Sequence, residues 1–119
     1  MSLRAKRSNP VHNEIAAVED DLAMTERMYI DTHCHLNFKE FDEDRAMVIG
    51  NAKKAGVKKF IIPGTNPITS KSATSLAATD STTLFASVGC HPYDTRNVPT
   101  RVEIERLISK RTIAIGECG

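Results

Sequence analysis

The chain has 119 residues, 40% of them hydrophobic, and its 16 Lys and Arg residues against 15 Asp and Glu residues leave a net charge of +1. This length and composition predict one globular domain with a modest core, and no apolar run approaches the roughly 18 residues of a membrane-spanning helix. The near-neutral charge provides no broad basic surface, so any contact with nucleic acid is expected to be local or metal-mediated.

Residues 1–27 differ from the rest of the chain. They begin with basic residues and a break at Ser8-Asn9-Pro10, after which apolar side chains recur at helical spacing between Glu14 and Arg27. The acidic residues of this segment exclude a typical transit peptide, and no apolar stretch resembles a secretory signal. We therefore expect a flexible or helical leader over residues 1–27 and the domain proper over residues 28–119.

From Met28 onwards the sequence repeats a strand followed by a helix. Apolar, strand-forming runs start 27 or 28 residues apart, and they cover Tyr29-Ile30, Val57 to Ile62, Leu84 to Val88 and Thr112 to Ile115. A regular alternation of strands with helix-length segments is typical of successive βα units in a parallel sheet.

The segments between these runs contain helix-capping residues. Asp42 is the expected cap of a helix that ends at Gly56, and Asn66-Pro67 is the expected start of the second helix. Thr100 and Glu103 have the spacing of a capping box before the third helix.

Four parallel strands and three helices predict an α/β fold, the amino-terminal half of a TIM (β/α)8 barrel, which typically takes about 250 residues. We therefore expect a fragment, or a chain that is completed by self-association or by a complementing second half.

The reactive polar residues collect where the predicted strands end: His33 and His35, the loop Gly64-Thr65-Asn66, His91-Pro92, and Glu117. The carboxyl ends of parallel strands meet at one edge of a sheet, where barrel active sites are built. Residues two apart in a strand point to the same side, so the imidazoles of His33 and His35 should aim at one place, with Asp31 on the same face. Two converging imidazoles are half of a metal site.

Simpler structural explanations exist for the other candidates. Glu117 could be a solvated loop carboxylate, and His91 could be a turn residue fixed by the proline that follows it. For residues 63–66 we favour an ordinary βα turn with a helix cap over a phosphate-binding loop. The cysteines follow strands but lack the short spacing of zinc sites, so we expect neither thiolate ligands nor a disulfide scaffold; they are Cys34, Cys90 and Cys118. We therefore expect a reducing compartment, either the cytoplasm or, if the source is a eukaryote, the nucleus.

Three segments together resemble the signatures of the TatD-type metal-dependent deoxyribonucleases, which belong to the amidohydrolase superfamily of (β/α)8 barrels. The segments are MYIDTHCHL at 28–36, VGCHP at 88–92 and IAIGECG at 113–119, and their order and spacing also match. The resemblance implies an enzyme that hydrolyses DNA phosphodiester bonds with two divalent ions (Mg, Mn or Zn), which activate water and stabilise charge on the phosphate.

The resemblance also implies roles for individual residues. His33 and His35 would bind one ion, Glu117 would bridge the two ions as a catalytic ligand, and His91 would be a catalytic contact to the substrate. Asp31 would be a hydrogen-bonded neighbour that orients an imidazole. The family supplies two further histidines and an aspartate from the second half of the barrel, so we expect weak metal binding and reduced activity from residues 28–119 alone. The alternatives are a hydrolase of the same superfamily that acts on an amide or lactone, or a non-catalytic half-barrel that binds a partner chain.

Overall fold

The computed structural model describes residues 27–118, so the leader predicted for residues 1–27 lies outside the described residues except for Arg27. The described chain forms a four-stranded parallel sheet in the order β1-β2-β3-β4. The strands are β1 (Tyr29–Asp31), β2 (Val57–Pro63), β3 (Leu84–Val88) and β4 (Thr112–Ile115). The predicted α/β alternation of a half-barrel is therefore confirmed, with strand bounds within one residue of those expected.

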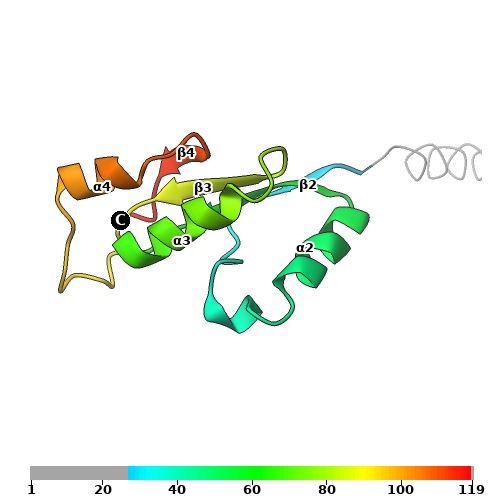
Figure 1. Cartoon of the computed structure of the whole chain (residues 1–119), viewed down its shortest axis with the longest axis horizontal. Helices are drawn as coiled ribbons and strands as arrows, with labels where there is room; N and C mark the ends of the chain where they lie inside the picture. Colours follow the sequence, from blue (N-terminus) through cyan, green and yellow to red (C-terminus); the bar gives the residue numbers. More distant parts are fainter. Residues whose placement is uncertain (1–26, 119) are drawn as a thin grey trace, which may run out of the picture.

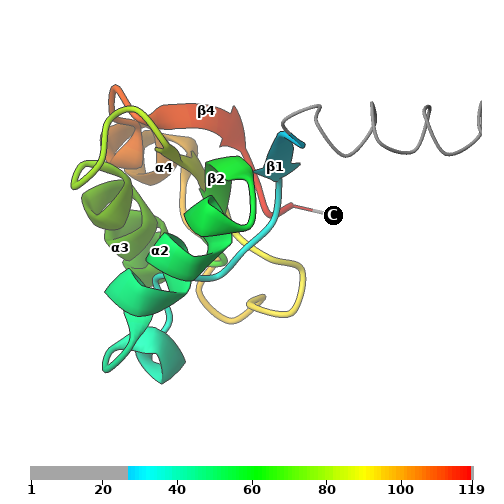
Figure 2. The same cartoon turned by 90° about the vertical axis from the view of Figure 1, so that its right-hand side faces the viewer.

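Three α-helices connect the strands: α2 (Arg45–Lys54), which follows the short 3-10 helix η1 (Lys39–Phe41), then α3 (Pro67–Ala77) and α4 (Arg101–Leu107). Helices α2 and α3 lie on the same side of the sheet, and α3 packs along β2 and β3 (Figures 1 and 2). Between residues 27 and 118, no helix has the length and apolar character needed to cross a membrane.

Two of the three predicted helix starts are confirmed by their hydrogen bonds. The side chain of Asn66 accepts the N–H of Thr69 at 2.9 Å, and the Thr69 hydroxyl accepts the N–H of Asn66 at 3.0 Å. Thr100 and Glu103 form the equivalent reciprocal box at the start of α4. Each such cap is worth roughly 0.5–2 kcal/mol because it satisfies otherwise unpaired N–H groups.

The prediction that Asp42 caps the first helix is wrong. Helix α2 begins at Arg45, and Asp42 instead ends η1, where its N–H donates to the carbonyl of Lys39 at 3.0 Å. The Asp42 carboxylate accepts the guanidinium of Arg45 at 2.6 Å and is therefore unavailable as a cap. The predicted end of this helix is confirmed, since Gly56 follows it with a φ of +106° that favours glycine.

The core lies between the two central strands and the helices. Its fully buried side chains from the sheet are those of Phe60, Ile62, Leu84 and Ala86, which meet Ala73 and Ala77 of α3. The outer strands differ, because all three residues of β1 and three of the four in β4 are exposed. Within residues 27–118, β1 and β4 are also the two edges of the sheet.

Candidate metal centre

The two histidines follow β1, which ends at Asp31, in a segment that stays attached to the neighbouring strand. The N–H of Cys34 donates to the carbonyl of Ile61 at 3.2 Å, and the Cys34 side chain packs against the core. His33 and His35 consequently point to the opposite side, as the alternation of extended backbone predicts. The two imidazoles therefore converge, although both histidines lie in the segment after β1 and not in the strand itself.

Glu117 is positioned by main-chain contacts at the ends of three strands. The N–H of Gly116 donates to the carbonyl of Val88, and the N–H of Glu117 donates to the carbonyl of Gly64, each at 2.9 Å. The end of β3 presses directly on this segment, because a Cβ atom on Gly89 would lie 2.5 Å from the carbonyl carbon of Gly116. A glycine at position 89 is therefore required for this approach.

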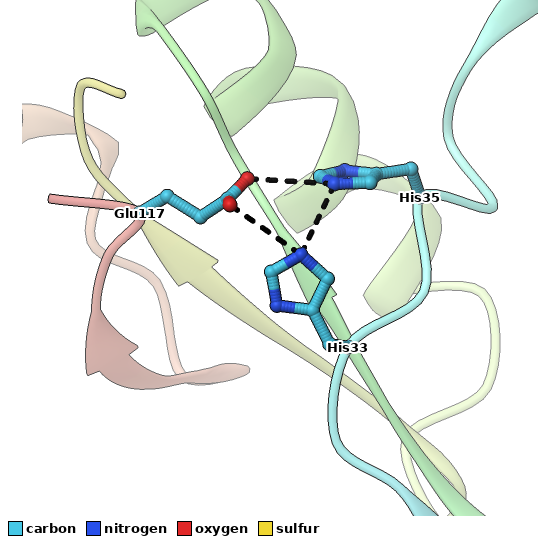
Figure 3. Close-up of side chains that lie close together, drawn as sticks. All are labelled: His33, His35 and Glu117. Atoms are coloured by element: carbon cyan, nitrogen blue, oxygen red, sulfur yellow. Dashed lines mark hydrogen bonds and ion pairs between the residues drawn. The ribbon is translucent and has the colours of Figure 1, made fainter. Parts of the chain in front are cut away.

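The side chains of His33, His35 and Glu117 meet in a triangle (Figure 3). The two Nε2 atoms are 3.2 Å apart, Nε2 of His33 is 3.4 Å from Oε1 of Glu117, and Nε2 of His35 is 3.4 Å from Oε2. Ligands bound tetrahedrally to zinc at about 2.0–2.1 Å stand roughly 3.3 Å from one another. The separations therefore fit a set of ligands around one divalent ion.

The chemistry of these donors also fits a cation. Two neutral imidazole nitrogens at this separation can pair only if one carries a proton, and the carboxylate beside them brings only acceptor atoms. A divalent cation would satisfy all three groups at once, and two histidines with one glutamate are a known ligand set of catalytic zinc sites.

His91 lies beside the triangle but not in it. Its Nε2 atom is 3.9 Å from Oε1 of Glu117, and its Nδ1 atom accepts the N–H of Tyr93 at 3.1 Å. Because Nδ1 is an acceptor, the neutral ring carries its proton on Nε2, which faces the carboxylate. The His91 side chain can therefore donate a hydrogen bond to a group held at the triangle.

Asp31 makes a different contact from the one expected. Its carboxylate accepts the backbone N–H of His33 at 3.1 Å, so it holds the main chain, and no imidazole is among its hydrogen-bond donors in the described part of the chain. Phe38 contacts the imidazole of His35 instead, with its ring stacked on that of His35 at 4.5 Å and 20°. Nδ1 of His35 is buried and has no hydrogen-bond partner among residues 27–118, so the stacked Phe38 ring restrains this imidazole together with the contacts of its Nε2 atom to His33 and Glu117.

A cleft of about 350 Å³ opens beside the triangle, lined by His35, Phe38, Thr65, His91, Tyr93, Asp94 and Glu117. Thr65 belongs to the loop after β2, and its carbonyl accepts the N–H of His91 at 2.7 Å. The next residue of this loop, Asn66, caps α3, in line with the turn favoured for it from the sequence. Tyr93 is 95% exposed, and its ring rests against that of His91 at 4.9 Å.

Sequence reasoning missed both aromatic residues of this cleft. The sequence gives only a weak indication for Phe38, namely its position three residues after His35. In the structure a turn, in which the N–H of Phe38 donates to the carbonyl of His35, brings the two rings together. Tyr93 lies in an irregular loop, where periodicity gives no information about the direction of a side chain.

None of the three thiols belongs to the triangle. Burial raises the pKa of Cys34 to about 12, with a smaller contribution from the charge of Asp31, so this thiol stays protonated. Cys90 is half-buried, whereas Cys118, next to Glu117, is exposed.

Comparison with known proteins adds a family match. The model of the family described as TatD related DNase matches residues 30–119. The "3'-5' ssDNA/RNA exonuclease TatD" of Erwinia amylovora is 34% identical over 92 residues, and that of Erwinia tasmaniensis is 36% identical over 92 residues; each alignment covers 75% of this chain and 36% of the relative. The protein of the same name from Pantoea ananatis is 35% identical and is covered to 35%. The chain thus spans about a third of the length of these curated relatives.

Proposed function

The chain belongs to the family of TatD-related DNases, and on that premise we propose that residues 28–119 carry part of the active site of a metal-dependent nuclease. The reaction is the hydrolysis of phosphodiester bonds in DNA, with a 3' end of a single strand as the substrate, as the names of the relatives imply for those proteins. The observation that carries the proposal is the triangle of His33, His35 and Glu117, whose separations suit one divalent ion.

Each residue has a distinct part in this proposal. His33 and His35 would hold one divalent ion, and Glu117 would be a ligand shared between that ion and a second one. Two imidazoles and one carboxylate favour Zn²⁺ over Mg²⁺, which prefers all-oxygen sites. The bound ions supply Lewis-acid chemistry that lowers the pKa of water and offsets the charge of the phosphate. His91 donates its Nε2 proton in a hydrogen bond to a phosphate oxygen, and Asp31 and Phe38 position the two ligating histidines.

The test is divalent-metal-dependent hydrolysis of 5'-labelled single- and double-stranded DNA by the purified 119-residue chain. We expect slow shortening of the single strand from its 3' end that requires Zn²⁺ or Mn²⁺ and stops in the His33→Ala/His35→Ala double variant. His12→Ala, which removes the one histidine of the leader, is the matched control and should keep the activity. A folded chain that cuts neither substrate with any metal would refute the nuclease proposal for this chain.

Metal binding provides a second readout that does not depend on activity. Calorimetric titration with Zn²⁺ should detect binding at the site of His33, His35 and Glu117. The affinity of this site should fall at least about 100-fold in Glu117→Gln, since even residues that only support a ligand contribute about 10- to 100-fold. Equal affinity in the wild type and in Glu117→Gln would remove this carboxylate from the ligand set.

We also propose that the two edge strands associate with a second copy of the chain. Support comes from the exposed apolar side chains that these strands and the residue before β1 present, those of Met28, Ile30, Ile113 and Ile115. Light scattering should then give twice the 13.1 kDa monomer mass. A chain that stays monomeric alone but binds an added carboxyl-terminal half would instead support a complementing partner.

The unpaired state of the three cysteines supports a reducing compartment, which we propose to be the cytoplasm.

A further inference from the structure

We propose that Tyr93 is a stacking platform for an unpaired nucleobase, namely the base next to the phosphate that the triangle would hold. The inference rests on the proposed function only for the position of that phosphate. The ligand is a single-stranded oligonucleotide with an accessible 3' end, and the contact is made by the free face of the Tyr93 ring.

Tyr93 is held in place at two points although its side chain is almost fully exposed. Its N–H donates to Nδ1 of His91 at 3.1 Å, and its ring packs against the imidazole at 4.9 Å with a tilt of 38°. The turn is closed by the N–H of Asp94, which donates to the carbonyl of His91 at 2.9 Å. A single exposed apolar side chain needs no explanation by itself, but this one is fixed beside a cleft and turns 95% of its surface to solvent.

The residues that line the cleft next to Tyr93 are of two chemically different kinds. Glu117 and His35 belong to the triangle, where a divalent ion would provide positive charge for a phosphate. Tyr93 lies outside the triangle and offers an uncharged aromatic face, which suits a neutral ring better than a second anion. A volume of about 350 Å³ is at the lower end of the roughly 300–1,000 Å³ typical of small-ligand sites, which suits one nucleotide unit.

The other aromatic residue of the cleft is less suitable as a platform. The ring of Phe38 is half-buried and lies nearly parallel to the His35 imidazole at 4.5 Å, whereas the ring of Tyr93 is tilted against His91 and 95% exposed. Stacking on tyrosine requires a base whose faces are accessible, and every base has such a face. A platform at Tyr93 therefore selects single strands over duplexes and is tolerant of base sequence.

The experiment measures binding of a phosphorothioate-linked decamer of thymidine that carries 2-aminopurine at its 3' end, in the presence of Mn²⁺. Stacking quenches the fluorescence of this base, and the uncleavable linkages keep the oligonucleotide intact. The same decamer with an abasic 3' end measures binding without a base at that position, and a 5' fluorescein label gives the affinity of both oligonucleotides by anisotropy. The variants are Tyr93→Ala and Tyr93→Phe, with Ile68→Ala as the control because Ile68 is exposed on α3 and does not line the cleft.

We expect Tyr93→Ala to weaken binding of the 2-aminopurine decamer roughly 5- to 100-fold and to abolish the quenching. Tyr93→Phe and Ile68→Ala should stay within about twofold of the wild type, since phenylalanine keeps the stacking face. The abasic decamer should bind equally to the wild type and to Tyr93→Ala. The proposal is overturned if Tyr93→Ala binds both decamers as the wild type does, or if the folded wild type binds neither.

Hydrolysis assays on the same preparations separate this proposal from the proposed function. Metal-dependent cutting without any effect of Tyr93 would overturn the stacking platform alone. Base-dependent binding through Tyr93 in a chain that cuts no DNA would support the platform and overturn the nuclease.

Discussion

The two central strands and the two outer strands of the sheet divide stability and candidate chemistry between them. Strands β2 and β3 hold the buried side chains that meet α3, whereas β1 and β4 are short and exposed. Yet the candidate ligands come from the outer pair, because His33 and His35 follow β1 and Glu117 follows β4. The central strands therefore act as a scaffold that holds the segments after the two edge strands, so that the side chains of His33 and His35 lie 3.4 Å from that of Glu117.

The largest effect is expected from a change in the centre. Ile62→Ala removes a side chain with no exposed surface and should lower the free energy of unfolding by about 2–5 kcal/mol, through lost burial and the cavity left behind. Ile113→Ala, in the half-exposed β4, is the matched control and should change it by less than about 1 kcal/mol at protein concentrations at which the chain is monomeric. Urea denaturation followed by circular dichroism measures both, and similar losses would contradict the division between centre and edge.

A smaller effect, which links centre to edge, is expected at Gly89. A Cβ atom there would lie 2.6 Å from the carbonyl oxygen of Gly116, so Gly89→Ala must displace the end of β4 and with it Glu117. We expect a loss of about 1–3 kcal/mol in stability from this overpacking. Zinc affinity should also fall, measurably by calorimetry.

Gly116→Ala is the control for Gly89, because a Cβ atom at 116 would meet only the Ser87 hydroxyl at an ordinary 3.9 Å. Normal stability and zinc affinity in Gly89→Ala would mean that the close approach does not set the position of Glu117.

A change at Phe38 tests how His35, which follows the edge strand β1, is held in place. Phe38→Ala removes the ring that restrains His35, and we expect zinc affinity to fall about tenfold because the imidazole then samples other rotamers. Phe38→Tyr keeps the stacked ring and should bind zinc as the wild type does. Unchanged affinity in Phe38→Ala would show that His35 is held by its backbone alone.

The smallest effect is expected for an ion pair far from the triangle. Lys53 Nζ lies 2.6 Å from Oδ2 of Asp80, and this contact, with the hydroxyls of Thr83 and Thr82, lowers the pKa of Asp80. A lowered pKa means that the stabilisation is present above the unfolded-state pKa of about 3.9 and is lost as the pH falls below it. Because both side chains are partly exposed, its size is about 1 kcal/mol or less.

Asp80→Asn should therefore be less stable than the wild type at pH 7, and the difference in denaturation midpoint should shrink as the pH falls below about 3.9. A difference that stays constant from pH 7 to pH 3 would exclude the ion pair as its cause.

The sequence was informative where local chemistry decides the structure. Asn66 and Thr100 cap helices as predicted, because their short polar side chains have no stronger local partner. Asp42 failed as a cap because Arg45 binds its carboxylate and an extra 3-10 turn intervenes, a competition that spacing alone does not reveal. The strand period predicted the parallel sheet, in which consecutive βα units place consecutive strands side by side.

The three candidate ligands could be predicted from the sequence, whereas the residues that position them could not. Parallel strands with ligand-type residues at their carboxyl ends predicted that His33, His35 and Glu117 would converge, and the family resemblance identified the same three. The residues around them escaped prediction, because Phe38 and Tyr93 act through ring faces whose direction depends on loop geometry. Asp31 was expected beside an imidazole, but its carboxylate accepts the backbone N–H of His33, which lies only two residues along the chain.

The unequal exposure of the three thiols has a practical consequence. Cys34, with a pKa of about 12, should resist alkylating reagents at neutral pH, because only the thiolate reacts. Cys118 is exposed and adjacent to Glu117 in the sequence, so it is the expected first target of a maleimide dye. The natural chain therefore contains its own attachment point for a fluorescent reporter beside the proposed ligands.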